Sequence, residues 1–185
     1  RKLRVACYGA SSEEMARYGE NEVAALRAEL CIGPDDVLVG SVGRLVEQKD
    51  YPTQLRAFAL ARREAPMLRM ALVGDGPLRK ELEERCAELG ISDHVRFVGH
   101  TERVPLYLRS LDVFVLASKF EPFGVALLEA KAAALPIVAT RVNEVPEIVG
   151  EAHGGLLVPK EDPQAMADAF VRMAREPALR DRKSV

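Results

Sequence analysis

The sequence predicts a doubly wound α/β domain, in which a parallel sheet is covered by helices on both faces. Short apolar segments alternate with longer segments of helical spacing along most of the chain. Residues 37–42 are apolar almost without interruption, which is typical of a strand buried on both faces of a parallel sheet. The 185 residues suffice for a sizeable core, so we expect residues 1–185 to form a single domain.

The predicted elements begin with a short strand pattern at Leu3, Val5 and Cys7, followed by an acidic, alanine-rich segment at 13–30 with helical spacing. A Gly-Pro-Asp-Asp sequence at 33–36 then breaks the chain. Further strands are expected at 37–42, 70–73, 95–98, 112–116, 137–139 and 155–158. Helices are expected at 51–64, 78–89, 104–110, 125–134, 146–149 and 163–175. In such sheets ligands bind beyond the carboxyl ends of the strands.

The composition excludes several classes of protein. Hydrophobic residues make up 48% and charged residues 29% of the chain, which is the balance of a globular domain. The 26 basic and 28 acidic residues leave a net charge of -2, so the broad electropositive surface of most nucleic-acid binders is not expected. No run of about 20 apolar residues occurs, and no membrane-spanning helix is predicted.

The cysteines and histidines indicate neither disulfides nor a metal site. Cys7, Cys31 and Cys86 are widely spaced, without a CxxC pair, as in small buried or half-buried residues of a reducing compartment. We therefore expect a cytoplasmic location, no cofactor and no metal. Because the chain begins with Arg1 rather than methionine, we expect it to be a fragment of a longer protein.

The stretch 118–136 joins a polar loop to an apolar helical segment. Glu129 is the one carboxylate inside that segment, and burial of an unpaired carboxylate is costly. Gly124 allows close approach of a ligand to the backbone, and the helix start favours phosphates. A ligand bound there would present a ribose to Glu129 and its other end to Glu121. The alternative is that Glu121 is a solvated loop acid and Glu129 points into water.

Two cations follow the strand at 37–42. Arg44 comes directly after the strand, and Lys49 comes five residues later, before the next helix. An arginine fork and a lysine point charge at one sheet edge suit a diphosphate. The alternative is that Arg44 pairs with Glu47 or Glu121 while Lys49 is solvated.

The glycines at 74 and 76 begin a GxGxxG pattern but lack its third glycine. A tight turn from strand to helix explains them better than a dinucleotide site. The sequence also contains no GxxxxGK[ST], GxSxG or HExxH motif, which argues against the corresponding enzyme classes.

Six motifs follow one another along residues 37–180. They are GRLVEQKD (43–50), LVGDGP (72–77), VRFVGH (95–100), LDVFVLAS (111–118), EPFGVALLEA (121–130) and VPEIV (145–149). In order and spacing they resemble the C-terminal, donor-binding domain of GT-B glycosyltransferases of the retaining group often called family 4. The two acids separated by seven residues, Glu121 and Glu129, carry the most specific part of this resemblance.

The resemblance implies a site for a nucleotide sugar, such as a UDP-, GDP- or ADP-sugar. It assigns the diphosphate to Arg44, Lys49, Phe123, Gly124 and Val125. It assigns the donor sugar, or the charge at its anomeric carbon, to Glu121, and the ribose hydroxyls to Glu129. It places the backbone of Val98, Gly99, His100 and Thr101 beside the base. It also implies transfer with retention, and no divalent metal at the diphosphate.

The sequence departs from the family at several positions. Asn143 and Glu144 stand where two glycines usually precede the VPEIV segment. Ala134 replaces a common glycine, and Lys131 replaces a common apolar residue. The opening turn at 8–11 lacks its frequent asparagine and aspartate.

GT-B enzymes place the acceptor on a separate N-terminal domain, for which this chain has no room. We therefore expect the donor-binding half of a hexosyl-type glycosyltransferase, inactive without that missing N-terminal domain. Two alternatives stay open: a nucleotide-binding or interaction module without catalysis, which Asn143-Glu144 favours slightly, and a GT-B nucleotide-sugar epimerase.

Overall fold

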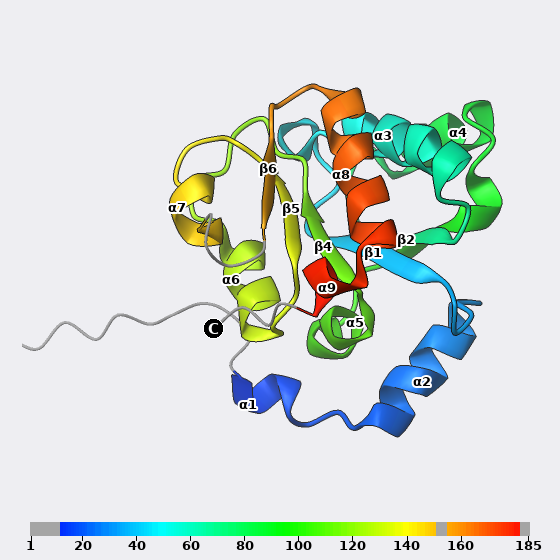
Figure 1. The fold of residues 1–185 in the computed structure, drawn as a ribbon, viewed down its shortest axis with the longest axis vertical. Coiled ribbons are helices and arrows are strands. Elements are labelled where there is room, and N and C mark those ends of the chain that lie inside the picture. Colours follow the sequence, from blue (N-terminus) through cyan, green and yellow to red (C-terminus); the bar gives the residue numbers. More distant parts are fainter. Residues whose placement is uncertain (1–11, 151–154, 182–185) are drawn as a thin grey trace, which may run out of the picture.

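The computed structural model describes residues 12–150 and 155–181. Within these residues, six parallel strands form one sheet in the order β3-β2-β1-β4-β5-β6 (Figure 1). The strands are β1 (Val37–Val42), β2 (Leu68–Val73), β3 (Val95–Gly99), β4 (Val113–Leu116), β5 (Ile137–Thr140) and β6 (Leu156–Val158). The predicted doubly wound α/β class is confirmed.

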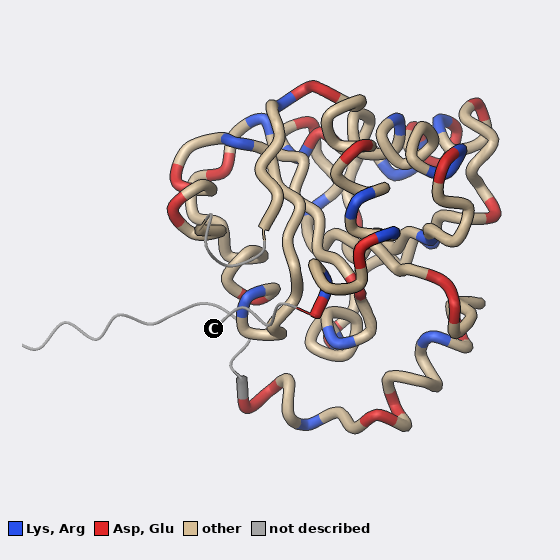
Figure 2. Tube along the Cα trace, viewed as in Figure 1, with Lys and Arg blue, Asp and Glu red and all other residues tan. Residues whose placement is uncertain are grey.

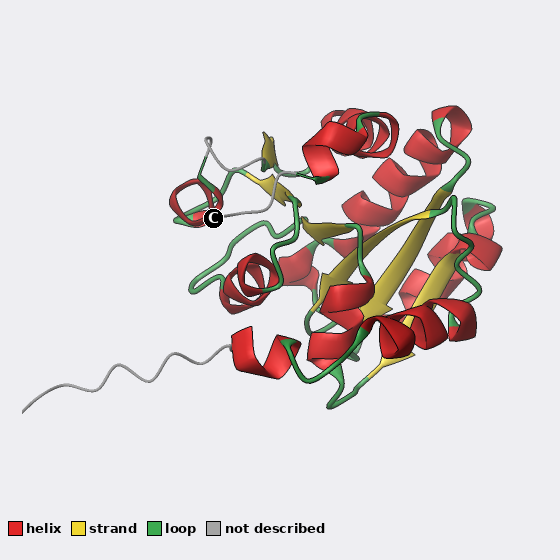
Figure 3. Ribbon diagram, turned by 60° about the horizontal axis from the view of Figure 1, so that its bottom comes forward, coloured by secondary structure: helices red, strands yellow, loops and turns green. Residues whose placement is uncertain are grey.

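Helices cover both faces of the sheet (Figure 3). One face carries α3 (Tyr51–Glu64), α4 (Arg79–Glu88) and α8 (Pro163–Arg175). The other carries α1 (Ser12–Met15), α2 (Glu20–Glu29), α5 (Val104–Ser110), α6 (Val125–Ala132) and α7 (Val145–Val149). Three short elements complete the described chain: η1 (Glu47–Lys49), η2 (Ser92–His94) and α9 (Pro177–Arg180).

The central strand β1 shows why both faces are covered. Val37 and Val39 belong to the hydrophobic cluster under α3, α4 and α8, whereas Leu38 belongs to the cluster on the opposite face. Successive side chains of a strand point to opposite faces, so a continuous apolar run needs helices on both sides.

The strand order reverses between β1 and β4, which are neighbours in the sheet although β2 and β3 separate them in the chain. The buried hydroxyl of Ser41 on β1 donates to the carbonyl oxygen of Val115 on β4 at 2.8 Å. The loops that follow β1 and β4 therefore leave the same edge of the sheet side by side. In doubly wound folds this reversal is where ligands bind.

Several boundaries differ from the sequence-based predictions. The segment predicted as helical at 13–30 contains two helices, and Gly19 at the start of α2 separates them. The helix α6 ends at Ala132, two residues before its predicted end, and Ala134 has a φ of 55°. Cys86 is buried, as expected, but Cys31 is exposed. The predicted strand at 3–7 and the opening turn at 8–11 lie outside the described residues.

Charged residues of both signs are interspersed along helices and loops, whereas β4, β5 and β6 carry none (Figure 2). Among the described residues, none of the helices has the length and apolar character required to cross a membrane. The same residues contain no group of three or more histidine, cysteine or acidic side chains that could hold a metal ion.

Candidate functional site

The predicted site residues gather at the carboxyl edge of the sheet. Arg44 and Lys49 lie in the β1–α3 loop, of which η1 is part, and Glu121 lies in the β4–α6 loop. Val125 and Glu129 lie on α6, directly after that loop. The fold thus brings together Lys49 and Glu121, which are 72 positions apart in the chain, because β1 and β4 are neighbours.

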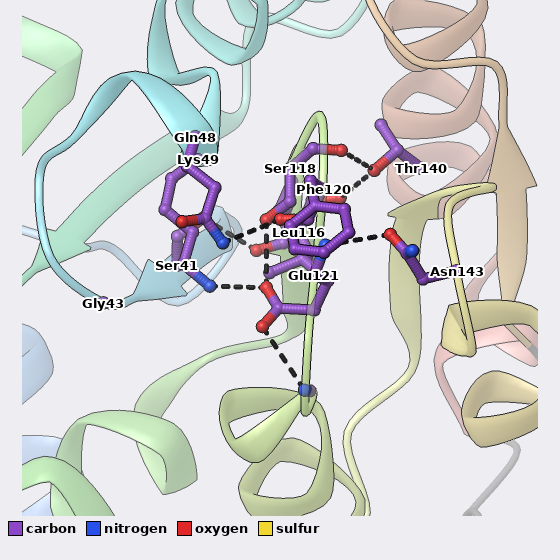
Figure 4. A network of polar contacts seen from close by, with 12 residues as sticks. Ser41, Gly43, Gln48, Lys49, Leu116, Ser118, Phe120, Glu121, Thr140 and Asn143 are labelled. Carbon is purple, nitrogen blue, oxygen red and sulfur yellow. Dashed lines mark hydrogen bonds and ion pairs between the residues drawn. The ribbon is translucent and has the colours of Figure 1, made fainter.

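Lys49 and Glu121 form an ion pair between the two loops (Figure 4). The distance from Lys49 Nζ to Glu121 Oε2 is 2.5 Å, and the two side chains are 18% and 8% exposed. The interpretation of Lys49 as a solvated cation is therefore wrong, and so is that of Glu121 as a solvated loop acid. Partial removal from water strengthens the attraction between the charges and makes the loss of either partner costly.

The other contacts of Glu121 also fix its carboxylate. Oε2 accepts a hydrogen bond from Ser118 Oγ at 3.1 Å, and Oε1 accepts one from the backbone N–H of Gly124 at 3.3 Å. Gly124 precedes α6 with a φ of 59°, a conformation that glycine adopts readily. Glu121 therefore links the loop, the start of α6 and Lys49. The spacing of Glu121 and Glu129 in the sequence predicted Glu121 as a site residue, but it did not predict these contacts.

Arg44 is exposed, and its side chain makes no hydrogen bond or ion pair with any described residue. The predicted alternative of a pair with Glu47 or Glu121 is therefore wrong. Arg44 lines a pocket of about 390 Å³ at the ends of β1, β2 and β3. The other lining residues are Val42, Gly43, Val73, Gly74, Asp75, His100, Thr101 and Val104. This pocket offers space for a ligand beside a guanidinium that can act as a hydrogen-bond donor.

Of the four residues predicted to border a base, His100 and Thr101 line this pocket. Val98 and Gly99 are not among its lining residues; the carbonyl oxygen of Gly99 accepts a hydrogen bond from the N–H of Gly74. Asp75 lines the pocket and was not predicted. Its position directly after β2, at the same sheet edge, is the signal that could have identified it.

The glycine-rich turn after β2 is structural, as predicted. A Cβ on Gly74 would lie 2.1 Å from the carbonyl oxygen of Gly43, and a Cβ on Gly76 would lie 2.4 Å from that of Leu45. The two loops also exchange backbone hydrogen bonds, one of them from the N–H of Leu45 to the oxygen of Asp75 at 3.0 Å. The glycines therefore allow the β1 and β2 loops to pack backbone against backbone.

The start of α6 keeps two free donors. The N–H of Gly124 is already donated to Glu121, whereas the N–H groups of Val125 and Ala126 have no hydrogen-bond partner in the described part of the chain. Such groups, with the helix dipole, favour an anion at the helix start. Phe123, directly before this start, is 80% exposed.

Glu129 lies one turn further along α6 and is half-buried. It follows Val125 by four residues, and so its side chain lies on the same face of the helix as that of Val125. Leu127 and Ala130 supply the buried face of α6, while Val125 and Leu128 are exposed. The predicted apolar helix therefore buries one face only, and Glu129 lies at the border of that face.

Tyr51, at the start of α3, forms a hydrogen bond with the β1–α3 loop. Its hydroxyl donates to the carbonyl oxygen of Gly43 at 3.3 Å. Burial, and then the negative charge of Glu121, raise the pKa of the Tyr51 phenol far above its usual range. Tyr51 therefore keeps its proton at all physiological pH values and remains a donor to the loop.

The sheet order, with charged loops meeting where the order reverses, defines a Rossmann-like α/β domain. The family model described as glycosyl transferases group 1 matches residues 23–184, and the chain belongs to this family. Its fold is that of the C-terminal domain of a GT-B enzyme.

Relatives and solved structures agree with this family. Glycosyltransferase LpsE of lipopolysaccharide core biosynthesis in Rhizobium meliloti is 34% identical over 160 residues, covering 86% of this chain and 46% of that protein. A D-inositol 3-phosphate glycosyltransferase of Saccharomonospora viridis is 37% identical over 179 residues, covering 90% and 41%. The chain thus spans somewhat less than half the length of these curated relatives. Both are glycosyltransferases, so the epimerase alternative receives no support.

Among solved structures, the C-terminal domain of a group 1 glycosyl transferase (LpcC) from Francisella tularensis has a TM-score of 0.81 at 25% identity. The match covers 95% of this chain and 93% of that one. Anabaena HepE, crystallised with UDP and glucose, has a TM-score of 0.84 at 22% identity, with 95% and 49% covered. This second likeness shows the shared fold.

Proposed function

We propose that this chain binds the nucleotide-sugar donor in a group 1 glycosyltransferase that transfers the sugar to an acceptor with retention. The observation that carries the proposal is the meeting of Arg44, Lys49, Glu121 and the start of α6 where the β1 and β4 loops lie together. The structures of Anabaena HepE with UDP and with UDP-glucose, which share this fold, support a donor of the same chemical class.

In this proposal the diphosphate lies between the two loops. The free guanidinium of Arg44, the ammonium of Lys49 and the N–H groups of Val125 and Ala126 bind its oxygens. Transfer breaks the bond between the anomeric carbon and the diphosphate oxygen, and the electron pair leaves with the diphosphate. The acceptor oxygen forms the new bond to the anomeric carbon, and its proton passes to the departing diphosphate. The same cations and dipoles stabilise the charge that develops on this leaving group.

The two carboxylates have different functions in this arrangement. Glu129 accepts hydrogen bonds from the ribose hydroxyls, a part of the donor that does not change during transfer. Glu121 lies beside the donor sugar, where positive charge develops at the anomeric carbon. The base occupies the pocket lined by Asp75, His100 and Thr101.

A binding experiment with Arg44 tests the diphosphate site most directly, because the Arg44 side chain makes no hydrogen bond or ion pair with a described residue that the substitution would remove. Titration calorimetry of the 185-residue chain with UDP, GDP and ADP should show binding that weakens as salt rises. Arg44→Ala should weaken it by about tenfold to a hundredfold, since a charge-assisted hydrogen bond contributes about 1.5–3 kcal/mol.

Arg63→Ala is the matched control for this experiment. It removes the same charge from the last turn of α3. The β1–α3 loop lies at the opposite end of this helix, where α3 begins at Tyr51. Equal losses in the two variants would show that only net charge matters. Absence of binding to all three nucleotides at millimolar concentration would contradict a preformed donor site.

Lys49 requires a compensated variant, because its removal leaves Glu121 buried without its cation. The double variant Lys49→Met/Glu121→Gln keeps the loop pair neutral and should still weaken diphosphate binding. Binding of the nucleoside alone should not change. Equal loss for nucleoside and diphosphate would remove Lys49 from the phosphate site.

Glutamine variants separate the two carboxylates. Glu129→Gln should lower the affinity for a nucleoside diphosphate but not the affinity for its 2′,3′-dideoxy analogue. The loss should appear mainly in ground-state binding. In the full-length protein, Glu121→Gln should lower turnover more than donor affinity. Should the wild-type full-length protein bind the donor and transfer no sugar to any acceptor, the chain would instead be a binding module.

A further inference from the structure

Asn143 lies in the loop between β5 and α7, at one of the two positions where the family usually has glycine. Its Oδ1 accepts a hydrogen bond from the backbone N–H of Glu121 at 3.2 Å (Figure 4). We propose that Asn143 is a positioning residue: it fixes the Glu121 peptide and thereby orients the Glu121 carboxylate toward the donor sugar. This inference rests on the proposed function.

The segment that carries Glu121 has no regular structure of its own. Eight residues, 117–124, separate the end of β4 from the start of α6. Gln48 holds one side of this segment: its carbonyl oxygen accepts from the N–H of Lys119, and its Nε2 donates to the oxygen of Phe120, both at 2.9 Å. Asn143 holds the other side. The backbone before Glu121 is therefore clamped between the loops after β1 and β5 (Figure 4).

The hydrogen bond to Asn143 holds the backbone of Glu121, whereas the other contacts hold its carboxylate. Lys49 pairs with the carboxylate in the present structure and also binds the diphosphate in the proposed function. A bound donor therefore competes with Glu121 for Lys49. The bond from the Glu121 N–H to Asn143 involves no group assigned to the donor, and so it persists when the donor binds.

Asparagine satisfies two requirements at this position. The residue has a φ of 45°, which glycine adopts without strain and which asparagine tolerates better than most residues. Glycine would meet the backbone requirement but would offer no acceptor to Glu121. A second departure from the family joins α6 to α7, since Lys131 Nζ on α6 donates to the carbonyl oxygen of Ile148 on α7 at 2.7 Å.

The test compares two ligands in the same chain: the nucleoside diphosphate that the wild-type chain binds most tightly among UDP, GDP and ADP, and the glucose derivative of that nucleotide. With uridine as the base these ligands are UDP and UDP-glucose. Asn143→Gly should reduce the affinity for UDP-glucose by about fivefold relative to that for UDP, as expected for one neutral hydrogen bond. Asn143→Asp retains an acceptor oxygen and tolerance of this φ, and should restore the ratio. The negative charge that Asn143→Asp adds should lower the affinity for both ligands by the same factor.

Glu144→Gly is the matched control, because it makes the neighbouring family-like change. The Glu144 side chain is exposed and makes no hydrogen bond or ion pair with any described residue. It should leave the ratio of the two affinities unchanged. If Asn143 had only a structural role, Asn143→Gly would lower the affinity for both ligands by the same factor, and that result would overturn the inference.

Hydrogen exchange of the Glu121 amide provides a readout that needs no ligand. Exchange should be several-fold faster in Asn143→Gly than in the wild type, and should return to the wild-type rate in Asn143→Asp. An unchanged rate would overturn the positioning role even if affinities changed. If the wild-type chain bound none of UDP, GDP and ADP, the proposed donor site itself would be wrong, and the orientation toward a donor sugar with it.

Discussion

At the scale of single residues, Asp50 is the polar side chain whose burial is least compensated. It precedes α3, is 4% exposed and has a φ of 48°. Its Oδ2 is buried and has no hydrogen-bond partner among the described residues. Burial raises the pKa of the Asp50 carboxyl above its usual 3.8, although Thr53 and Lys119 act in the opposite direction. The folded protein therefore disfavours the charged form.

The raised pKa of Asp50 predicts how the effect of Asp50→Asn on stability depends on pH. A raised pKa in the folded state means that ionised Asp50 lowers stability above that pKa and has no effect below 3.8. Asp50→Asn should therefore raise the free energy of unfolding at neutral pH by about 1 kcal/mol, the lower end for a buried unsatisfied group. The gain should disappear as the pH falls toward 3.8. Urea unfolding at several pH values measures it.

Asp35→Asn is the control for this measurement. Asp35 is exposed in the turn before β1, and its variant should stay within about 0.5 kcal/mol of the wild type. A loss of stability in Asp50→Asn at neutral pH would mean that the carboxylate is a net stabiliser of the α3 start.

At the scale of elements, α6 positions the site, and its end carries a residue that fits poorly. The N–H of Leu135 donates to the carbonyl oxygen of Ala130 at 3.0 Å, and that of Ala134 to Lys131 at 2.9 Å. This is the Schellman motif, whose left-handed position is usually glycine. Ala134 occupies it with a φ of 55°. The helix α4 ends in the same way, with Gly90 at a φ of 67°.

The two helix ends predict opposite effects of exchanging alanine and glycine. Ala134→Gly should raise the free energy of unfolding by about 0.5–1 kcal/mol, because the strain of an L-residue in this conformation exceeds the entropy cost of glycine. Gly90→Ala should lower it by about 1 kcal/mol. A Cβ at Gly90 would have no atom within 4 Å, so that variant measures backbone strain alone. Thermal or urea unfolding of both variants checks the pair, and changes of equal sign would contradict it.

At the scale of the whole molecule, the sheet separates two hydrophobic clusters that must form together. Phe170 of α8 is fully buried in the cluster that also contains residues of α3 and of β1. The contact between α3 and α8 therefore connects the last long helix of the chain to a helix that begins more than 100 positions earlier.

Phe170→Ala should lower the free energy of unfolding of the whole domain by about 3–5 kcal/mol, as for other buried phenylalanines. Unfolding should remain a single transition, since the core is shared. Arg172→Ala on the exposed side of the same helix loses only a surface ion pair with Glu176, and should cost less than about 0.5 kcal/mol. A loss below 1 kcal/mol for Phe170→Ala would show that α8 is not part of the cooperative core.

The sequence by itself determined the fold class and which residues to consider for the candidate site. Local patterns sufficed for this: the apolar run at β1 requires cover on both faces, and charged loops after β1 and β4 predict a ligand at the sheet edge. The motif spacing of Glu121 and Glu129 predicted which acids to examine. These features depend on neighbours within a few residues, and a single sequence records them.

Tertiary structure alone decided how the site residues contact one another. The pairing of Lys49 with Glu121 depends on β1 lying beside β4, which no local spacing encodes. For the same reason Asp75 was missed as a pocket residue, and Arg44 was given partners that it does not have. Asn143 was visible only as a departure from two glycines; its contact with Glu121 arises because the loops after β4 and β5 leave adjacent strands of one parallel sheet.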